Sequence, residues 1–257
     1  MNSTSRQVAR SGRTAGSGIV FFLSFAESND DEDAMVVAFF RRLCDEVRAV
    51  RGTRRGDPAP IGFLSIASLR LGADWSEEIR IALGTCRVFV AVCSPTYFGS
   101  ESCGREWQAF ADRLSEYRRS TGRSAPSLFP VRWRPTRIPE QLDSIQYVDR
   151  ELSPAVFDEG LRQVMLLDGH RDAYHRFVTR FADLIVQTAH EYDVPPSTPG
   201  PDFYRLPQAF PHPPPPEPIP RQRATGHTDD RRTGSDGEPL HPPDLGGGHE
   251  LPRLHPN

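Results

Sequence analysis

The chain has 257 residues, a formal net charge of −3 and no lysine, and it lacks the basic patch or stripe that a nucleic-acid-binding protein needs. Its longest apolar runs are strand-length, far short of the ~20 residues of a membrane span, so we expect no membrane-embedded segment. It carries four cysteines and no recognisable signal peptide, which predicts a cytoplasmic protein with reduced thiols.

The composition changes sharply near Pro195, after which proline dominates and large apolar residues become scarce. Such a segment cannot bury enough apolar surface to offset the entropy of ordering. We therefore expect a disordered N-terminus over residues 1–17, one folded domain over 18–192 and a disordered proline-rich tail over 193–257. In the tail, the run from His212 to Pro220 favours polyproline II, which suits either docking to protein partners or a solvated spacer.

Apolar runs alternate with helical spacings along the folded part. Strands are predicted at residues 19–25, 61–64, 87–93, 127–133 and 145–148. Helices are predicted at residues 29–50, 75–83, 103–117, 161–167 and 172–192, with loops at 65–74 and 94–102. This alternation implies right-handed crossovers and a flavodoxin-like three-layer α/β fold, with a five-stranded parallel sheet between two layers of helices.

Ligands of such folds bind beyond the carboxyl ends of the strands, which here are followed by residues 24–29, 65–75 and 94–106. The sequence contains no P-loop, no dinucleotide fingerprint after a strand and no nucleophile elbow. Its cysteines and histidines do not follow metal-ligand spacing, so no metal site is expected. Any chemistry should come from these three segments.

Four short motifs in order carry a family resemblance. They are Phe22-Leu-Ser-Phe25, a loop with Gly72 ahead of Trp75, the strand ending Ser94-Pro-Thr-Tyr97, and Cys103-Gly-Arg-Glu106 at a helix start. In this order and spacing the chain resembles the TIR domain family over residues 18–192. The resemblance implies a TIR fold that acts in signal transduction through self-assembly.

The chain is similar in particular to the TIR-like proteins called FxsC. The matching stretches are Cys103-Gly-Arg-Glu-Trp107, Pro130-Val-Arg-Trp-Arg-Pro135 and Ile145-Gln-Tyr147. FxsC proteins accompany Fxs peptide-modification systems, so this likeness implies work beside a peptide-maturation cassette.

Many TIR domains cleave NAD⁺ at the nicotinamide–ribose bond with a glutamate that corresponds to Glu106. Nicotinamide leaves as a neutral group, so no general acid is needed. The ribose develops oxocarbenium character, which a fixed carboxylate can stabilise. The resemblance thus implies NAD⁺ as a substrate, no bound cofactor, and Glu106 as the catalytic residue. A structural glutamate, favoured by the dipole of the helix it begins, is the alternative.

The other candidate nucleotide-binding residues lie at strand ends and in the adjoining loops: Ser24, Phe25, Gly72, Trp75, Ser100 and Cys103. By resemblance, Trp75 would stack on the nucleotide, although it could equally anchor its helix to the sheet. Ser24 would line the crevice or serve the fold alone. Ser100 and Cys103 would form the wall next to Glu106.

The chain departs from the family pattern at two places. Ser65 stands where many TIR domains carry an acid, and Ala26-Glu27 stands where a basic residue is common. Two hypotheses follow: an NAD⁺ glycohydrolase that is active as a homo-oligomer, and a non-catalytic adaptor, which these departures favour. A sensor that binds the nucleotide without turnover lies between them.

Overall fold

The computed structural model describes residues 19–53, 60–66, 77–136, 139, 151–197, 200–202 and 205–210. Their strands form one parallel sheet in the order β2-β1-β3-β4. The strands are β1 (Phe21–Phe25), β2 (Gly62–Ile66), β3 (Val88–Cys93) and β4 (Leu128–Arg132). The predicted three-layer α/β fold is confirmed, and the strand order is that of flavodoxin-like sheets.

The strand count is four in the described part of the chain, where the sequence predicted five. The predicted fifth strand, residues 145–148, lies outside the described residues. The four observed strands coincide with the first four predicted strands, which were recognised as apolar runs. Parallel strands that are covered by helices on both faces have this continuous apolar character.

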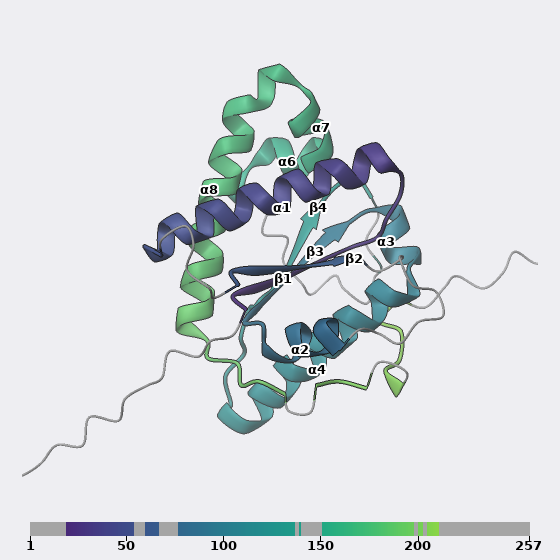
Figure 1. The fold of residues 1–257 in the computed structure, drawn as a ribbon, viewed down its shortest axis with the longest axis vertical. Helices are drawn as coiled ribbons and strands as arrows, with labels where there is room; N and C mark the ends of the chain where they lie inside the picture. The colour runs from purple at the N-terminus through teal and green to yellow at the C-terminus, as the bar shows by residue number, and fades with distance from the viewer. Residues whose placement is uncertain are drawn as a thin grey trace, which may run out of the picture. The chain divides into compact units, whose positions relative to one another are not determined.

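Helices cover both faces of the sheet (Figure 1). On one face lie α1 (Asp30–Arg51), α6 (Pro154–Glu159), α7 (Leu161–Leu166) and α8 (Arg171–Glu191), with the short η2 (Asp168–His170) leading into α8. On the other face lie α2 (Glu77–Thr85) and α4 (Glu101–Thr121). The predicted helices are present, and α6 is an addition that the sequence did not predict.

A short helix replaces the predicted loop after β3. This helix, α3 (Pro95–Gly99), begins at Ser94, whose hydroxyl accepts a hydrogen bond from the amide of Tyr97 at 3.1 Å. Pro95 occupies the first helical turn, where its missing N–H costs nothing. The prediction of a loop over 94–102 was therefore wrong: Pro95, taken as a turn residue, starts a helix.

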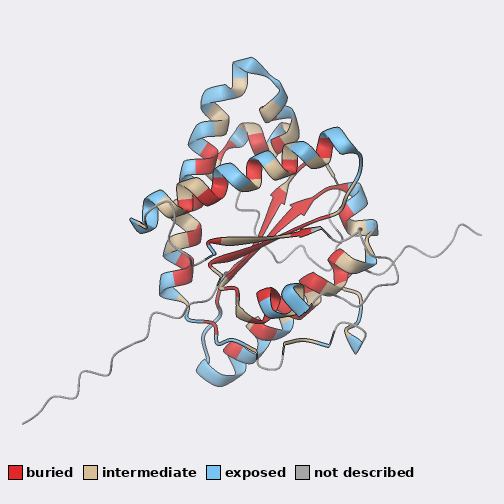
Figure 2. Ribbon diagram, viewed as in Figure 1, coloured by how far each residue is buried: buried red, intermediate tan, exposed pale blue. Residues whose placement is uncertain are grey.

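The sheet separates two hydrophobic clusters because successive side chains of a strand point to opposite faces. Phe21, Leu23 and Phe25 pack towards α1 and α8, whereas Phe22 packs towards α2 and α4. Figure 2 shows buried residues along the strands and on the sheet-facing sides of the helices. The second cluster is strongly aromatic, with Phe89 within 5.6 Å of Phe22 between ring centroids.

The chain stays packed against the domain after α8 ends. The described part of residues 194–210, here called the C-terminal strap, runs beside α2 and α4 (Figure 1). The Ser197 amide donates to the Gly84 carbonyl at 2.9 Å, and the Ala209 amide donates to the Gly104 carbonyl at 3.3 Å. Phe210, which is 1% exposed, belongs to the aromatic cluster under α4.

This packing continues beyond residue 192, where the sequence predicted the domain to end. The described part of the strap is held by isolated apolar side chains and by backbone hydrogen bonds to α2 and α4. Such anchors leave no periodic pattern, and the proline content of the segment predicted disorder instead. Residues 211–257 of the predicted tail and the N-terminal residues 1–18 lie outside the described residues.

Glycines mark the places where the strap approaches the helices. A Cβ added to Gly104 would lie 2.8 Å from Cγ of Gln208, and one added to Gly200 would lie 2.7 Å from the carbonyl oxygen of Arg80. Both distances are shorter than real Cβ contacts allow. The close approach of the strap to α2 and α4 therefore depends on the lack of a side chain at these positions.

Arg113 of α4 joins three parts of the structure. Its side chain is buried, with the residue 7% exposed, and its guanidinium donates to the carbonyls of Leu83 at 2.6 Å, Cys86 at 2.8 Å and Pro195 at 3.1 Å. The first two carbonyls belong to the end of α2, and the third belongs to the strap. Arg113 therefore fixes α2, α4 and the start of the strap to one another.

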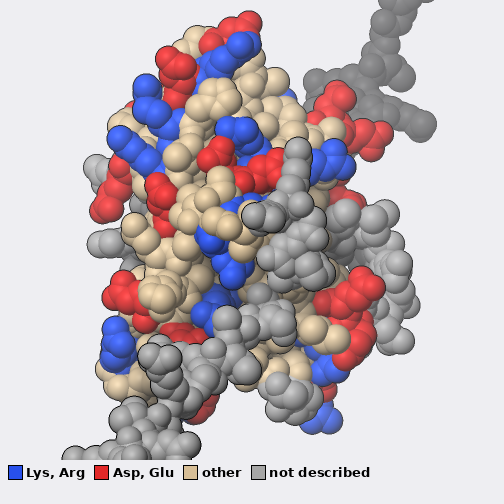
Figure 3. Space-filling model, turned by 60° about the vertical axis from the view of Figure 1, so that its left-hand side comes forward, with Lys and Arg blue, Asp and Glu red and all other residues tan. Residues whose placement is uncertain are grey.

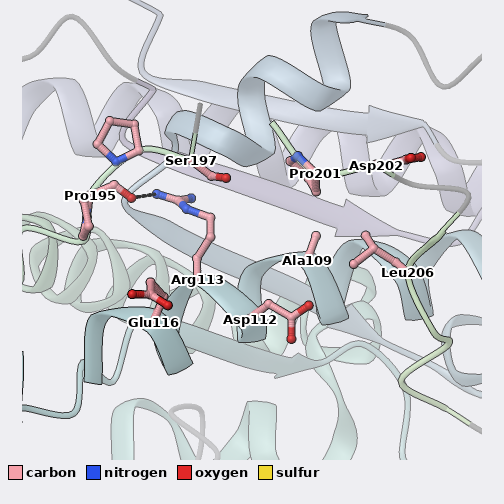
Figure 4. Close-up of a pocket in the computed structure, with 10 residues that line it drawn as sticks. Ala109, Asp112, Arg113, Glu116, Pro195, Ser197, Pro201, Asp202 and Leu206 are labelled. Carbon is pink, nitrogen blue, oxygen red and sulfur yellow. Dashed lines mark hydrogen bonds between the residues drawn. The ribbon is translucent and has the colours of Figure 1, made fainter. Parts of the chain in front are cut away.

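The middle of the strap stands away from α4 over a pocket of about 330 Å³. Figure 4 shows strap residues Pro195, Ser197 and Leu206 facing Ala109 and Arg113 of α4 across this space. Between its two ends the strap also contacts α2, because the Arg80 guanidinium donates to the Gly200 carbonyl at 3.4 Å.

Replacement of Arg113 by methionine should destabilise the fold. It leaves three carbonyls without their donor in a buried place, which should lower the free energy of unfolding by about 2–4 kcal/mol. Arg119→Met is the matched control, because Arg119 lies on the same helix but is 71% exposed and pairs only with Glu116; it should cost at most about 0.5 kcal/mol. Urea unfolding monitored by circular dichroism measures both, and equal losses would contradict the role of Arg113.

Candidate functional site

The candidate site lies at the carboxyl edge of the sheet, where the chain topology reverses. Strand β1 is followed by α1 on one face, whereas β3 is followed by α3 and α4 towards the other face. In open parallel sheets, this divergence of consecutive helices leaves the crevice in which ligands bind. The ends of β1 and β3 therefore define the expected binding region.

Glu106 extends from α4 into this region. The helix begins at Glu101, capped by the Ser100 hydroxyl, which accepts from the amide of Cys103 at 3.3 Å. Glu106 is thus in the second turn, not in the first turn that the sequence predicted. The helix dipole acts mainly on the first turn, so it does not explain this glutamate. Its side chain points towards the sheet, and the residue is 0% exposed.

Two serine hydroxyls hold the two oxygens of the Glu106 carboxyl. Ser24 of β1 donates to Oε2 at 2.5 Å, and Ser65 of β2 donates to Oε1. The two serines are direct neighbours in the sheet register, so their hydroxyls project from the same face. The carboxyl group therefore bridges the ends of the two strands from the helix above them.

Tyr97 of α3 completes this group. Its hydroxyl donates to Oγ of Ser24 at 3.2 Å, and Ser24 in turn donates to Glu106. A serine hydroxyl has only one proton to donate, so a donor on its other side commits that proton to the carboxyl. The order Tyr97, Ser24, Glu106 is therefore a directed chain of hydrogen bonds inside the apolar cluster.

Burial raises the pKa of Glu106 to about 7, and the bonds from Ser24 and Ser65 oppose that rise. The other buried glutamate, Glu32 of α1, shows the opposite behaviour. Arg134 donates to both of its oxygens, at 2.9 and 2.7 Å, and holds the pKa of Glu32 below its usual value. The contacts at Glu106 come from neutral hydroxyls, so its charge is not compensated in the same way.

The neighbouring titratable groups stay neutral around pH 7. Burial is the main cause that raises the pKa of the Tyr97 hydroxyl and that of the Cys103 thiol well above their usual values, and the nearby charge of Glu106 adds to both shifts. Glu106 is therefore the group of this cluster that changes charge near neutral pH. Two carboxyls in one domain, Glu32 and Glu106, are set to different charge states by their surroundings.

The predicted site residues divide into three groups. Ser24 binds Glu106 directly, and Cys103 lies next to it in the buried cluster. Ser100 is half-buried and caps α4, whereas Phe25 packs into the other hydrophobic cluster, and its part in nucleotide binding stays a prediction. Alternation along β1 turns Phe25 away from Ser24. Gly72 and Trp75 lie outside the described residues.

Sequence reasoning missed two members of the site, Ser65 and Tyr97. Ser65 was noted only as a departure from the family pattern, yet it occupies in β2 the place that Ser24 occupies in β1. Ser65 could have been found from the sequence, because each of these two apolar strands has a single hydroxyl near its end. Tyr97 belongs to the motif Ser94–Tyr97, but nothing in the sequence indicated that its hydroxyl would bond to Ser24.

The residues that the structure describes also bear on metal binding and on surface charge. Among those residues, no group of three or more histidine, cysteine or acidic side chains could hold a metal ion, and no helix is long and apolar enough to cross a membrane. Acidic and basic side chains alternate over the face shown in Figure 3.

Replacement of Glu106 by glutamine should change how stability depends on pH. A pKa raised from 4.5 to about 7 means that the folded wild type binds more protons than the unfolded chain between these values, so its stability falls as pH rises through them. The loss is about 3 kcal/mol by pH 8. Glutamine carries no such charge and can still bond both serines, so Glu106→Gln should gain that amount relative to wild type between pH 4.5 and pH 8.

Urea unfolding of both proteins at several pH values measures this difference. Glu101→Gln removes the same formal charge from the exposed first turn of the same helix and serves as the control. A difference between Glu106→Gln and wild type that stays constant from pH 4.5 to 8 would show that the carboxyl titrates like an ordinary surface group.

The comparison with known proteins agrees with this geometry. A search of the curated proteins found no match. The family model described as TIR domain matches residues 21–165, which is more than half of the chain. The matched region runs from β1 into α7 and includes Ser24, Ser65, Tyr97 and Glu106. The chain therefore belongs to the TIR domain family.

Proposed function

We propose that this TIR domain acts in signalling as an NAD⁺ glycohydrolase, with Glu106 as the catalytic carboxylate. The observation that carries the proposal is the buried carboxyl of Glu106 at the carboxyl edge of the sheet, which has a raised pKa and, among the described residues, two serine hydroxyls as its hydrogen-bond partners. Buried groups with strongly perturbed pKa values gather at active sites. A purely structural carboxyl, such as Glu32, has an arginine partner.

The chemistry fits a single carboxylate. NAD⁺ and water give ADP-ribose, nicotinamide and a proton. The bond from the ribose carbon to the nicotinamide nitrogen breaks, and its electron pair neutralises the positive ring. An ionised Glu106 would stabilise the positive charge that develops on the ribose and would take the proton of the attacking water. No metal and no second carboxyl are required for these steps.

The described arrangement is a closed one. Both carboxyl oxygens of Glu106 are bonded to serines, and the side chain is inaccessible to solvent. A substrate can reach it only if the bonds to Ser24 and Ser65 are exchanged for bonds to the ligand. We propose that self-assembly of the TIR domain, which is common in this family, favours the open arrangement. We also propose that the four buried cysteines are kept reduced in the cytoplasm.

The alternative is a non-catalytic adaptor, and the same closure favours it. A carboxyl group that is fully buried and fully bonded can simply fix two strands to a helix. The likeness to FxsC, with its link to Fxs peptide maturation, remains a prediction within either function. The proline-rich tail would then recruit protein partners.

Purified wild-type protein at high concentration, with a crowding agent present, should release nicotinamide from NAD⁺. Glu106→Gln should lower the rate by a factor of about 10²–10³, because the developing charge loses its carboxylate. Glu101→Gln should match wild type, since it changes an exposed residue of the same helix. Chromatography of nicotinamide measures the three proteins side by side.

Absence of nicotinamide release from the folded, assembled wild type would rule out the enzyme and leave the adaptor. Binding of NAD⁺ without release, measured by calorimetry, would identify a sensor instead. Assembly that is unaffected by Glu106→Gln would agree with all three functions, so it decides nothing alone.

The catalytic rate should depend on pH in the direction set by the raised pKa. The carboxyl of Glu106 must be ionised to act, so kcat/KM should rise as pH increases through about 7 and then level off. An ordinary exposed glutamate would already be ionised by pH 5.5. A profile that is flat between pH 5.5 and 8 would contradict the assignment of Glu106, even if NAD⁺ is cleaved.

A further inference from the structure

The end of the C-terminal strap lies against the candidate site. The Phe210 ring packs among Tyr97, Phe98 and Trp107, with ring centroids at 5.7, 5.1 and 5.4 Å. These three aromatic residues come from α3 and α4, the two elements that follow β3. Phe210 is therefore an apolar anchor on the helices that carry Tyr97 and Glu106.

Two contact routes lead from this anchor to the carboxyl. The first passes through side chains: Phe210 contacts the Tyr97 ring, and the Tyr97 hydroxyl bonds to Ser24, which bonds to Glu106. The second passes through backbone, because the Ala209 amide bonds to the carbonyl of Gly104, two residues before Glu106. The strap thus constrains both the hydrogen-bond chain and the helical turn on which Glu106 sits.

The Phe210 end can be released while the other end stays fixed. The start of the strap is held separately by Arg113 and by the bond between Ser197 and Gly84. Gly200 also contacts Arg80 of α2, so the strap keeps contacts of its own ahead of residues 205–210. The pocket of about 330 Å³ lies between this part of the strap and α4 (Figure 4). Release at Phe210 therefore does not require unfolding of α2 or α4.

We infer that the end of the strap, residues 205–210, is an intramolecular restraint that keeps Glu106 in its closed, serine-bonded arrangement, and that release of Phe210 opens the site. The inference rests on the proposed function in one respect: the exposed carboxyl of Glu106 would then act on NAD⁺. The restraint itself is a property of the fold and can be measured without NAD⁺. Family membership alone does not predict it, because the TIR match ends at residue 165.

Three full-length variants test the restraint from both sides of the contact. Phe210→Ala removes the anchor, whereas Phe210→Leu keeps an apolar side chain of similar size and is the matched control. Gly104→Ala acts from the domain side, where its new Cβ would meet Gln208 at 2.8 Å. Alanine is also the better helix former, so α4 itself should not lose stability.

Two readouts are made in the absence of NAD⁺. Trypsin cleavage after Arg205, followed by mass spectrometry, reports opening of the strap; it should rise at least about tenfold in Phe210→Ala and Gly104→Ala. Titration of the ¹³C-labelled glutamate carboxyl signal, assigned with Glu106→Gln, reports the site; its midpoint should fall from about 7 by at least about one pH unit in the same variants. Phe210→Leu should stay close to wild type in both.

Faster cleavage with an unchanged titration midpoint would overturn the inference, because the strap would then open without affecting Glu106. Unchanged cleavage in both Phe210→Ala and Gly104→Ala would overturn it as well. Nicotinamide release, assayed in parallel, should be faster in the opened variants. If both strap readouts move and no variant releases nicotinamide, the restraint is supported and NAD⁺ cleavage is rejected.

Discussion

The structure of the site depends on one constraint: a carboxyl group lies in an aromatic cluster, and its hydrogen-bond partners among the described residues are two neutral serines. Glu106 is tolerated there because Ser24 and Ser65, adjacent in the sheet register, supply one donor to each of its oxygens. Those bonds reduce the cost of burial but do not remove it, which is why the pKa of Glu106 stays raised. Ionisation of the buried Glu106 carboxyl is therefore unfavourable, and a positively charged ligand could make it favourable.

Under the proposed function, the positive charge of NAD⁺ would suit this arrangement. The nicotinamide ring of NAD⁺ is positive before the bond breaks, and the ribose is positive as it breaks. Either charge next to Glu106 would favour the ionised carboxyl, so ligand binding and ionisation support each other. The contrast with Glu32 is useful here, because Arg134 already compensates that carboxyl and leaves no comparable gain for a ligand.

The sequence predicted the layers well, because buried parallel strands are long apolar runs whose carboxyl ends share one edge. It put Glu106 at that edge, but one turn too early in its helix. It did not predict α3, whose only signals were a capping serine and Pro95. It also missed Ser65, since a partner on a neighbouring strand leaves no local pattern, and the strap, since Phe210 is a single aromatic residue among prolines. The roles of Gly72 and Trp75 and the strand at residues 145–148 stay predictions.

The strap also affects where the protein can be cut for study. A chain ended at Tyr192, directly after α8, would uncover the aromatic faces of Phe98 and Trp107 and would leave the guanidinium of Arg113 without the Pro195 carbonyl. Exposed apolar patches of this kind promote non-specific association. Oligomers of such a shortened chain would arise from these exposed apolar side chains. They would be easily confused with the physiological assembly of a TIR domain.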